Sequence, residues 1–263
     1  MTAMDKELIR DFALNLGVDY VGFAAAESYN SPRSPELTSL MPEVRSLVVL
    51  AFRELSTCES QSPQIAMAGR MDVMEFSRSV NYRLASYLER SGSKAMTVPA
   101  SYPMEMSAST KGSIGEVSLR HAAVAAGLGT FGRHNIVIHP KLGTRVIFSA
   151  ILTSLDIPSD TPVAENLCLQ CDACVGSCPG NALAVPGQTN VGRCLGKSQP
   201  YGIGGSIKFW SRFDEADGQE RQAMLKDPEY WKLYQAGFIG FQYFCFNCMK
   251  SCPVAQLKGR EHD

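Results

Sequence analysis

Hydrophobic and polar positions in the first 160 residues follow two periods, one typical of helices and one typical of buried strands. Apolar residues at helical spacing predict helices over 5–16, 73–90 and 116–126. Short apolar runs predict strands over 20–25, 46–52, 94–99, 135–139 and 144–155. Polar or Ser-, Pro- and Gly-rich stretches predict loops over 30–35, 55–64 and 101–115. This mixture predicts an α/β or α+β domain.

A stretch bounded by Pro158 and Pro162 separates this region from one with a different pattern. We place a domain boundary here, with one domain over 1–160 and a second over 161–263. The second domain contains an insertion at 196–244 that holds 11 of the 23 aromatic residues of the chain (12 Phe, 2 Trp and 9 Tyr). The second domain therefore combines a cysteine-rich part with an aromatic-rich part.

Two cysteine runs dominate the second domain. The first, from Cys168 to Pro179, reads C-x2-C-x2-C-x3-C-P, the bacterial ferredoxin pattern in which the fourth cysteine ligates the other cluster of a pair. The second run, from Cys245 to Pro253, lacks the leading cysteine, and Cys194 is its natural replacement. The crossing rule predicts two 4Fe–4S clusters, one held by Cys168, Cys171, Cys174 and Cys252 and the other by Cys178, Cys194, Cys245 and Cys248. This pattern indicates electron transfer.

Zinc is the alternative metal, because four-cysteine zinc sites also use paired C-x2-C motifs. Three cysteines at steps of three, followed by Cys-Pro and accompanied by a partner run, favour iron–sulfur clusters. The ninth cysteine, Cys58, lies outside both runs, and we interpret it as a buried or incidental thiol. Eight of the nine cysteines are therefore expected to bind metal rather than form disulfides.

The composition of the chain bears on its cellular location and on its binding partners. The net charge of −1 argues against a nucleic-acid partner. Hydrophobic residues at 45% and charged residues at 19% are typical of a soluble globular protein. No apolar run approaches the roughly 20 residues of a membrane span, and charges stand where a signal peptide needs its apolar region. We therefore expect a cytoplasmic protein without a membrane partner.

A glycine-rich stretch, Gly127-Leu-Gly129-Thr-Phe-Gly132, matches the letters of the dinucleotide-binding motif. That motif requires a strand before it and a helix after it. Here the predicted helix precedes the glycines and the predicted strand follows them. We therefore expect the glycines to let the backbone pass close to a packed element or to a flat cofactor.

The order of these motifs resembles that of the epoxyqueuosine reductases and the corrinoid reductive dehalogenases. The matching residues are Ala126–Arg133, Ile151–Asp156, Arg193-Cys194 and the two cysteine runs. The resemblance spans most of residues 8–253. It implies an α+β protein with a nitroreductase-like cobalamin-binding domain followed by a ferredoxin-like domain with two 4Fe–4S clusters.

The resemblance also implies a function. It points to a reductase that passes electrons from an external donor of the ferredoxin or flavodoxin type, through two clusters, to a base-off corrinoid that reduces a small-molecule substrate. It assigns cofactor binding to Gly127, Leu128, Gly129, Gly132 and Arg133. The absence of any His in a D-x-H-x-x-G arrangement fits base-off binding, and fits a protein without cobalamin equally well. His121, His134 and His139 are interpreted as ordinary polar contacts.

The predicted helix at 73–90 carries the candidate catalytic residue. In the reductases this helix opens with Arg-Asp-Tyr-His, and Glu75 falls on the aspartate, which is thought to donate a proton to the substrate. A carboxyl group near an apolar cofactor can act as a general acid. The alternative interpretation is a first-turn glutamate favoured by the helix dipole. The dehalogenases use a tyrosine donor, which keeps Tyr82, Tyr87 and Tyr102 as further candidates.

Three departures limit the resemblance. The chain ends at Asp263, so the tRNA-binding domain of the reductases is expected to be missing, and the segment after residue 25 looks shorter. The aromatic insertion is interpreted either as packing around the clusters or as a lid over a pocket. The alternatives are a redox partner that reduces corrinoids, an epoxyqueuosine reductase, and a flavin enzyme on the same scaffold.

Overall fold

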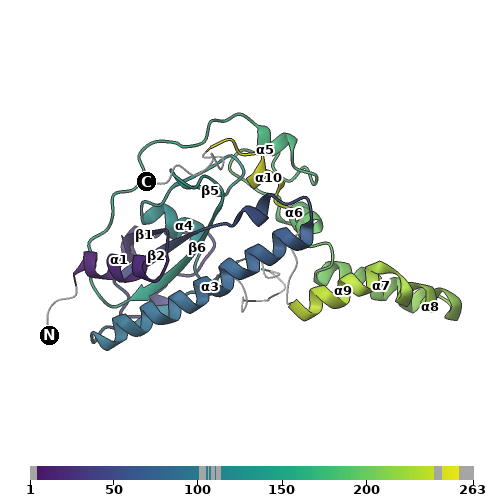
Figure 1. The fold of residues 1–263 in the computed structure, drawn as a ribbon, viewed down its shortest axis with the longest axis horizontal. Helices are drawn as coiled ribbons and strands as arrows, with labels where there is room; N and C mark the ends of the chain where they lie inside the picture. The colour runs from purple at the N-terminus through teal and green to yellow at the C-terminus, as the bar shows by residue number, and fades with distance from the viewer. Residues whose placement is uncertain are drawn as a thin grey trace.

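A computed structural model describes residues 5–100, 105, 107, 110, 114–239 and 245–254 of the chain (Figure 1). Its mixed α+β fold is built on a four-stranded antiparallel sheet in the order β1-β2-β6-β3. The strands are β1 (Tyr20–Ala25), β2 (Ser46–Arg53), β6 (Val146–Thr153) and β3 (Ala95–Thr97). All residues of β6 and all but the last of β2 are buried, as continuous apolar runs predict.

The sheet is buried on both faces, because alternate strand residues enter two separate cores. In β2, one core receives Leu47, Val49 and Ala51, and the other receives Val48, Leu50 and Phe52. Helix α4 (Leu119–Ala125) packs on the first face. Helices α1 (Lys6–Asn15) and α3 (Pro63–Arg90) pack on the second face (Figure 1). The result is a three-layer arrangement of helix, sheet and helix.

The predicted helices and strands of this region are confirmed, with one boundary wrong. Helix α3 begins at Pro63 rather than at residue 73, so the predicted loop at 55–64 contains only the short helix η2 (Ser56–Glu59) and a link. Ser62 caps α3 by accepting a hydrogen bond from the Ile65 amide, and a proline fits the first turn of a helix. Glu75 therefore lies in the middle of the helix and not in its first turn.

The shorter elements connect the sheet to the cysteine runs. Strands β4 (Thr130–Phe131) and β5 (Val137–Ile138) form a small hairpin after α4. The remaining short helices are η1 (Ala26–Ser28), α2 (Leu37–Leu40), α5 (Ala173–Gly176), α6 (Val191–Ser198) and α10 (Asn247–Lys250). Most of the predicted loop at 101–115 lies outside the described residues. No helix in the described parts of the chain is long and apolar enough to cross a membrane.

The aromatic insertion forms an arm of three helices that extends away from the sheet (Figure 1). Its helices are α7 (Ile203–Glu215), α8 (Gly218–Lys226) and α9 (Pro228–Ile239). Phe209 is buried at the centre of the arm, with its ring 6.3 Å from that of Phe213 and 6.0 Å from that of Tyr230. The arm thus packs its aromatic residues largely on one another.

Candidate iron–sulfur centre and adjoining cavity

The two cysteine runs adopt the same local structure and lie against each other. Each run contains one short helix, α5 or α10, followed by its Cys-Pro pair. Ser177 Oγ lies 2.9 Å from Ser251 Oγ, and Asn247 Nδ2 donates to the Ser177 carbonyl oxygen at 3.2 Å. These contacts bring residues about 70 positions apart in the chain into one cluster of thiols.

Cys168, Cys171, Cys174 and Cys252 form the first set of neighbouring thiols, which we call the outer set. Burial raises the pKa of Cys174, and the charges of Cys168 and Cys171 raise it further. Burial also raises the pKa of Cys252, with the same two cysteines adding to the effect and Arg145 opposing it. The structure thus brings Cys252 of the second run to the first three cysteines of the first run.

Cys178, Cys194, Cys245 and Cys248 form the second set, which we call the inner set. Burial raises the pKa of Cys248 to about 12, and Cys245, Cys194 and Cys178 each raise it further. Burial likewise raises the pKa of Cys194, with Cys245 and Cys178 adding to the effect. Cys178, Cys194 and Cys245 thus lie near Cys248, and the division of the eight cysteines into two cluster ligand sets stays a prediction.

The donor chemistry of both sets fits iron–sulfur clusters. Crowded, buried thiols resist ionisation, and a bound metal centre supplies the positive charge that makes four thiolates stable together. In the described parts of the chain, no three Cys, His, Asp or Glu side chains converge closely enough to hold a single metal ion.

Backbone amides point at one sulfur in each set. The Arg133 amide donates to Cys168 Sγ at 3.3 Å, and the Ala182 amide donates to Cys178 Sγ at 3.3 Å. Hydrogen bonds of this kind stabilise the more reduced, more negative state of a cluster. The β4–β5 turn therefore contacts the outer set directly through Arg133.

The two sets differ in their access to solvent. Cys171 of the outer set is exposed, and the adjacent Leu169 has 66% of its surface exposed. Gln170 and Asp172 hold this loop in a left-handed backbone conformation, with φ of 52° and 57°. The outer set therefore reaches solvent at Cys171, whereas its Cys174 and Cys252 are buried.

The inner set faces a cavity of ≈ 1020 Å³, and all four of its cysteines line the wall. The rest of the wall comes from separate segments of the chain, at 31–34, 98–100, 114–121, 131 and 134–136, and from several residues between 178 and 198. This volume is at the upper end of the range for small-molecule and cofactor sites. The four inner thiols thus line a cavity large enough for a cofactor-sized ligand.

The five residues predicted to bind the cofactor do not line this cavity. A side chain at Gly129 would lie 2.2 Å from the Ile138 carbonyl oxygen, and one at Gly127 would lie 2.5 Å from the Thr161 carbonyl oxygen. Leu128 is buried in the core, and Arg133 forms an ion pair with Asp172. The glycines are therefore explained by close packing of protein backbone, while the neighbouring Phe131 and His134 line the cavity.

Glu75 and the candidate tyrosines also lie away from the cavity wall. Glu75 is exposed on α3 and does not line the cavity, and Tyr82 is exposed on the same helix. Tyr87 stacks on Phe12 with ring centroids 4.1 Å apart, and Tyr102 lies outside the described residues. Glu116 and His121, in contrast, line the cavity wall, although the sequence analysis did not consider them as proton donors.

Arg145 and Arg70 hold the second cysteine run in place, a role that the sequence analysis missed. Arg145 is 3% exposed and donates to the carbonyl oxygens of Cys252 at 3.0 Å and Lys250 at 2.9 Å. It also pairs with Glu59 at 2.9 Å. The Arg70 guanidinium lies 5.1 Å from the Phe246 ring centre and pairs with buried Glu54. The only sequence signal for Arg145 is a lone charge at the start of an apolar strand.

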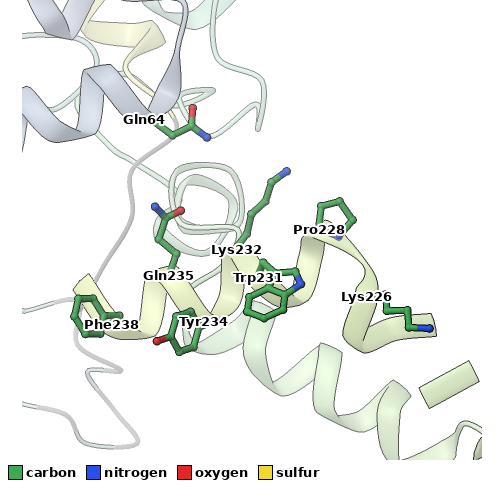
Figure 2. A pocket seen from close by; sticks show the side chains of 8 residues that line it. All are labelled: Gln64, Lys226, Pro228, Trp231, Lys232, Tyr234, Gln235 and Phe238. Carbon is green, nitrogen blue, oxygen red and sulfur yellow. The ribbon is translucent and has the colours of Figure 1, made fainter. Parts of the chain in front are cut away.

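The arm does not form the predicted lid in the described structure. No residue between 199 and 239 lines the cavity. A separate hollow of ≈ 700 Å³ lies along α9. Its lining residues Trp231, Tyr234 and Phe238 follow one another on α9, and Gln64 of α3 lies opposite (Figure 2). Of the insertion's eleven aromatic residues, Phe241, Tyr243 and Phe244 lie outside the described residues.

Comparison with known proteins places this geometry in context. No family model matches the chain. The epoxyqueuosine reductase of Bacillus subtilis strain 168 is 24% identical over 212 residues, which cover 72% of this chain and 54% of that protein. The chain therefore spans about half the length of this curated relative.

Solved structures show the same fold. The structure of epoxyqueuosine reductase from Bacillus subtilis matches with a TM-score of 0.61 at 19% identity, over 97% of this chain and 66% of that chain. A reductive dehalogenase described with a mechanism for B12-dependent dehalogenation matches with a TM-score of 0.60 at 20% identity, over 73% of this chain and 28% of that chain. The chain is thus homologous to the epoxyqueuosine reductases and structurally similar to the reductive dehalogenases, and it covers only part of either.

Proposed function

We propose that this protein is an iron–sulfur reductase in which two 4Fe–4S clusters connect the protein surface to a corrinoid and a small-molecule substrate in the cavity. The observation that carries the proposal is the position of the inner cysteines, all four of which line the cavity wall. Electron transfer requires the donor cluster to lie close to the acceptor, and this arrangement supplies that proximity.

The path begins at the outer set in this proposal. An external donor protein of the ferredoxin or flavodoxin type approaches the exposed Cys171 and the apolar side chain of Leu169. Cys174 lies close enough to Cys248 for its charge to affect the pKa of Cys248, so the two sets adjoin each other. In this proposal electrons enter beside the exposed Cys171 and pass to the inner set, whose four cysteines line the cavity.

The proposal places a large cofactor, a corrinoid, in the cavity. Its volume of ≈ 1020 Å³ accommodates a ligand larger than a typical substrate, and its wall combines apolar side chains with polar donors. Buried His134 Nε2 has no hydrogen-bond partner among the described residues, although the His134 side chain lines the cavity. A bound corrinoid supplies low-potential reducing chemistry that amino-acid side chains lack.

In this proposal the residues of the cavity wall bind, orient and protonate the substrate. Apolar Phe131, Val98 and Leu183 exclude water from the space beside the inner set. In our proposal Glu116 and His121 take over from Glu75 as candidate proton donors. His121 Nδ1 lies 2.7 Å from Ser118 Oγ, and its ring lies 4.9 Å from that of Phe131, so the imidazole is held in one orientation.

Anaerobic purification followed by incubation with cobalamin tests this proposal. We expect one cobalamin to stay bound per chain after gel filtration, and we expect its visible spectrum to become that of the base-off form. The matched control is Cys58→Ala, which removes a buried thiol outside both sets. An unchanged cobalamin spectrum, or stoichiometric flavin in the purified protein, would refute the corrinoid part of the proposal.

Epoxyqueuosine reduction is the second candidate function, because it is the activity named for a curated relative that is 24% identical over 72% of this chain. Incubation of the cluster- and cobalamin-loaded protein with epoxyqueuosine-modified tRNA separates the two candidates. Conversion to queuosine would identify the protein as such a reductase. Cobalamin binding without conversion supports a different substrate, and a stable complex with a corrinoid protein without turnover supports a redox-partner role.

A further inference from the structure

The charged side chains on the cavity wall are strongly unbalanced. Arg33, Arg120 and Lys197 line the cavity, and Glu116 is the one carboxylate among its described lining residues. Surface cations are ordinarily interspersed with anions, so a local excess on a concave wall attracts negative charge. The electrostatics of the wall therefore favour an anionic ligand.

Arg120 is the best-defined member of this group. It lies near the start of α4, and its Nη1 donates to the Asn135 carbonyl oxygen at 2.7 Å. Arg120 is exposed as a whole residue. Partial removal of its guanidinium group from water lowers the pKa of Arg120, and the positive charge of Arg33 lowers it further. Two guanidinium groups thus lie close enough to repel each other on the same wall.

His134 lies next to the residue that Arg120 contacts and adds a neutral donor. The Ile136 amide donates to His134 Nδ1 at 3.1 Å, so the proton of the neutral ring is on Nε2. The side chain is 4% exposed, and its Nε2 has no partner in the described parts of the chain. Buried N–H groups are rarely left without an acceptor, which indicates that a ligand atom accepts this bond.

Gly132 is the residue that makes this placement of the imidazole possible. A side chain at Gly132 would lie 2.5 Å from His134 Cε1 and 3.0 Å from Nδ1. The third glycine of the Gly127–Gly132 stretch therefore leaves room for the His134 ring. The stretch contributes to the cavity indirectly, by positioning a neighbour rather than by touching a ligand.

We propose that Arg33, Arg120 and His134 form an oxyanion site in the cavity that binds a carboxylate or phosphate group. The planar guanidinium forks suit the two oxygens of such a group, and the imidazole N–H adds a directional bond. The proposal deepens the proposed function by naming an anionic substrate class. Only the reaction of that substrate rests on the proposed function, whereas anion binding at the site does not. The site itself is built from residues outside both cysteine sets.

The oxyanion has two sources, the substrate and the phosphodiester of a bound cobalamin. Both present the same chemistry to the arginines. Cobinamide, which lacks the nucleotide and its phosphodiester, separates them. If cobalamin displaces inorganic phosphate and cobinamide does not, the site holds the cofactor. If phosphate or benzoate still binds to the cobalamin-loaded protein, the site holds the substrate.

Isothermal titration of the cluster-loaded protein with inorganic phosphate and with benzoate, at low and high salt, tests the site. We expect Arg120→Gln and Arg33→Gln each to weaken binding roughly 10- to 100-fold, the range for loss of a charge-assisted hydrogen bond. Arg120→Lys keeps the charge but loses the fork, so intermediate weakening is expected. The matched control is Arg78→Gln, which removes one exposed positive charge from α3.

The outcomes separate this site from the proposed function. Absence of phosphate and benzoate binding to the wild-type protein, or equal weakening by Arg78→Gln and Arg120→Gln, would overturn the oxyanion site. Thermal melting of each variant checks that the fold is intact. Phosphate binding that depends on Arg120 in a protein that takes up no corrinoid would support the site and overturn the corrinoid part of the proposed function.

Discussion

Arg145 Nη1 donates a hydrogen bond of 3.0 Å to the backbone carbonyl oxygen of Cys252, across 107 positions of the chain. This bond joins the beginning of the buried strand β6 to the last ligand of the outer set. Arg145 also pairs with Glu59, so one buried side chain ties the sheet, η2 and the second cysteine run together. The position of Cys252 therefore depends on the packing of the sheet and not on its own run alone.

Replacement of Arg145 by Met should detach the second cysteine run from the sheet. We expect the iron content to fall from about eight to about four per chain as the outer cluster is lost. Loss of the donors to the Cys252 and Lys250 carbonyl oxygens leaves these acceptors unpaired, at a cost of about 1–3 kcal/mol, so the melting temperature should also fall. Iron analysis and thermal melting measure both effects. Arg78→Gln is the control. Eight irons per chain in the Arg145 variant would show that Arg145 does not hold the second cysteine run in place.

The crossed cysteine sets predict which substitutions share a phenotype. Cys171→Ser and Cys252→Ser should remove the same cluster signal from the electron paramagnetic resonance spectrum of the reduced protein. Cys194→Ser and Cys248→Ser should both remove the other signal. The physical reason is that each pair belongs to one set of neighbouring thiols. Loss of the same signal on substitution of Cys252 and of Cys248 would show that the runs are not crossed.

The sequence analysis predicted the strands of the sheet correctly, because burial of a strand on both faces produces an apolar run in the sequence. The strands at 20–25, 46–52 and 144–155 are continuous apolar runs because the sheet is covered on both faces. The two cysteine sets are predictions from spacing, and the substitutions above test them. The beginning of α3 was missed because a proline-containing polar stretch resembles a loop, although a proline also suits the first turn of a helix.

The cavity was beyond reach of the sequence analysis for a different reason. Its wall combines segments from 31–34 to 245–248 that are distant in the chain, so no local pattern marks it. His134 was interpreted as an ordinary polar contact because burial and an unpaired Nε2 are properties of the fold. The glycines were correctly expected to permit close approach, and the structure shows protein backbone, not ligand, beside Gly127 and Gly129.

Substitution of Gly129 by Ala tests this packing role. Gly129 has φ of +156°, and an added Cβ would lie 2.2 Å from the Ile138 carbonyl oxygen. We expect the free energy of unfolding to fall by more than about 2 kcal/mol. Gly218→Ala is the control, because nothing lies within 4 Å of its added Cβ, and a change within about 1 kcal/mol is expected. An unaltered fold that no longer binds cobalamin would indicate direct cofactor contact instead.

Two buried histidines predict how stability depends on pH. Burial lowers the pKa of His134 and of His139 to about 4. A base whose pKa is lower in the folded state stabilises the fold above its unfolded pKa of about 6.5, and this contribution is lost as the pH falls. Each histidine should therefore add a slope of up to about 1.4 kcal/mol per pH unit between pH 6.5 and 4.

Urea unfolding at pH 7.0 and 5.5, followed by far-ultraviolet circular dichroism, measures this slope. His139 Nδ1 accepts hydrogen bonds from the Lys141 and Leu142 amides, so His139→Asn keeps an acceptor while removing the titrating ring. The variant should lose about half of the pH dependence that the two histidines contribute. A slope equal to that of the wild-type protein would show that His139 does not titrate differently in the folded and unfolded states.

The most direct test of an electron path from two clusters into the cavity is one sample of anaerobically reconstituted, cobalamin-loaded protein. Its metal content and its cobalt electron paramagnetic resonance spectrum are measured together. We predict about eight irons per chain and a base-off cobalt signal broadened by magnetic coupling to the neighbouring inner cluster. Stoichiometric zinc, or a cobalt signal identical to that of free cobalamin, would contradict the account.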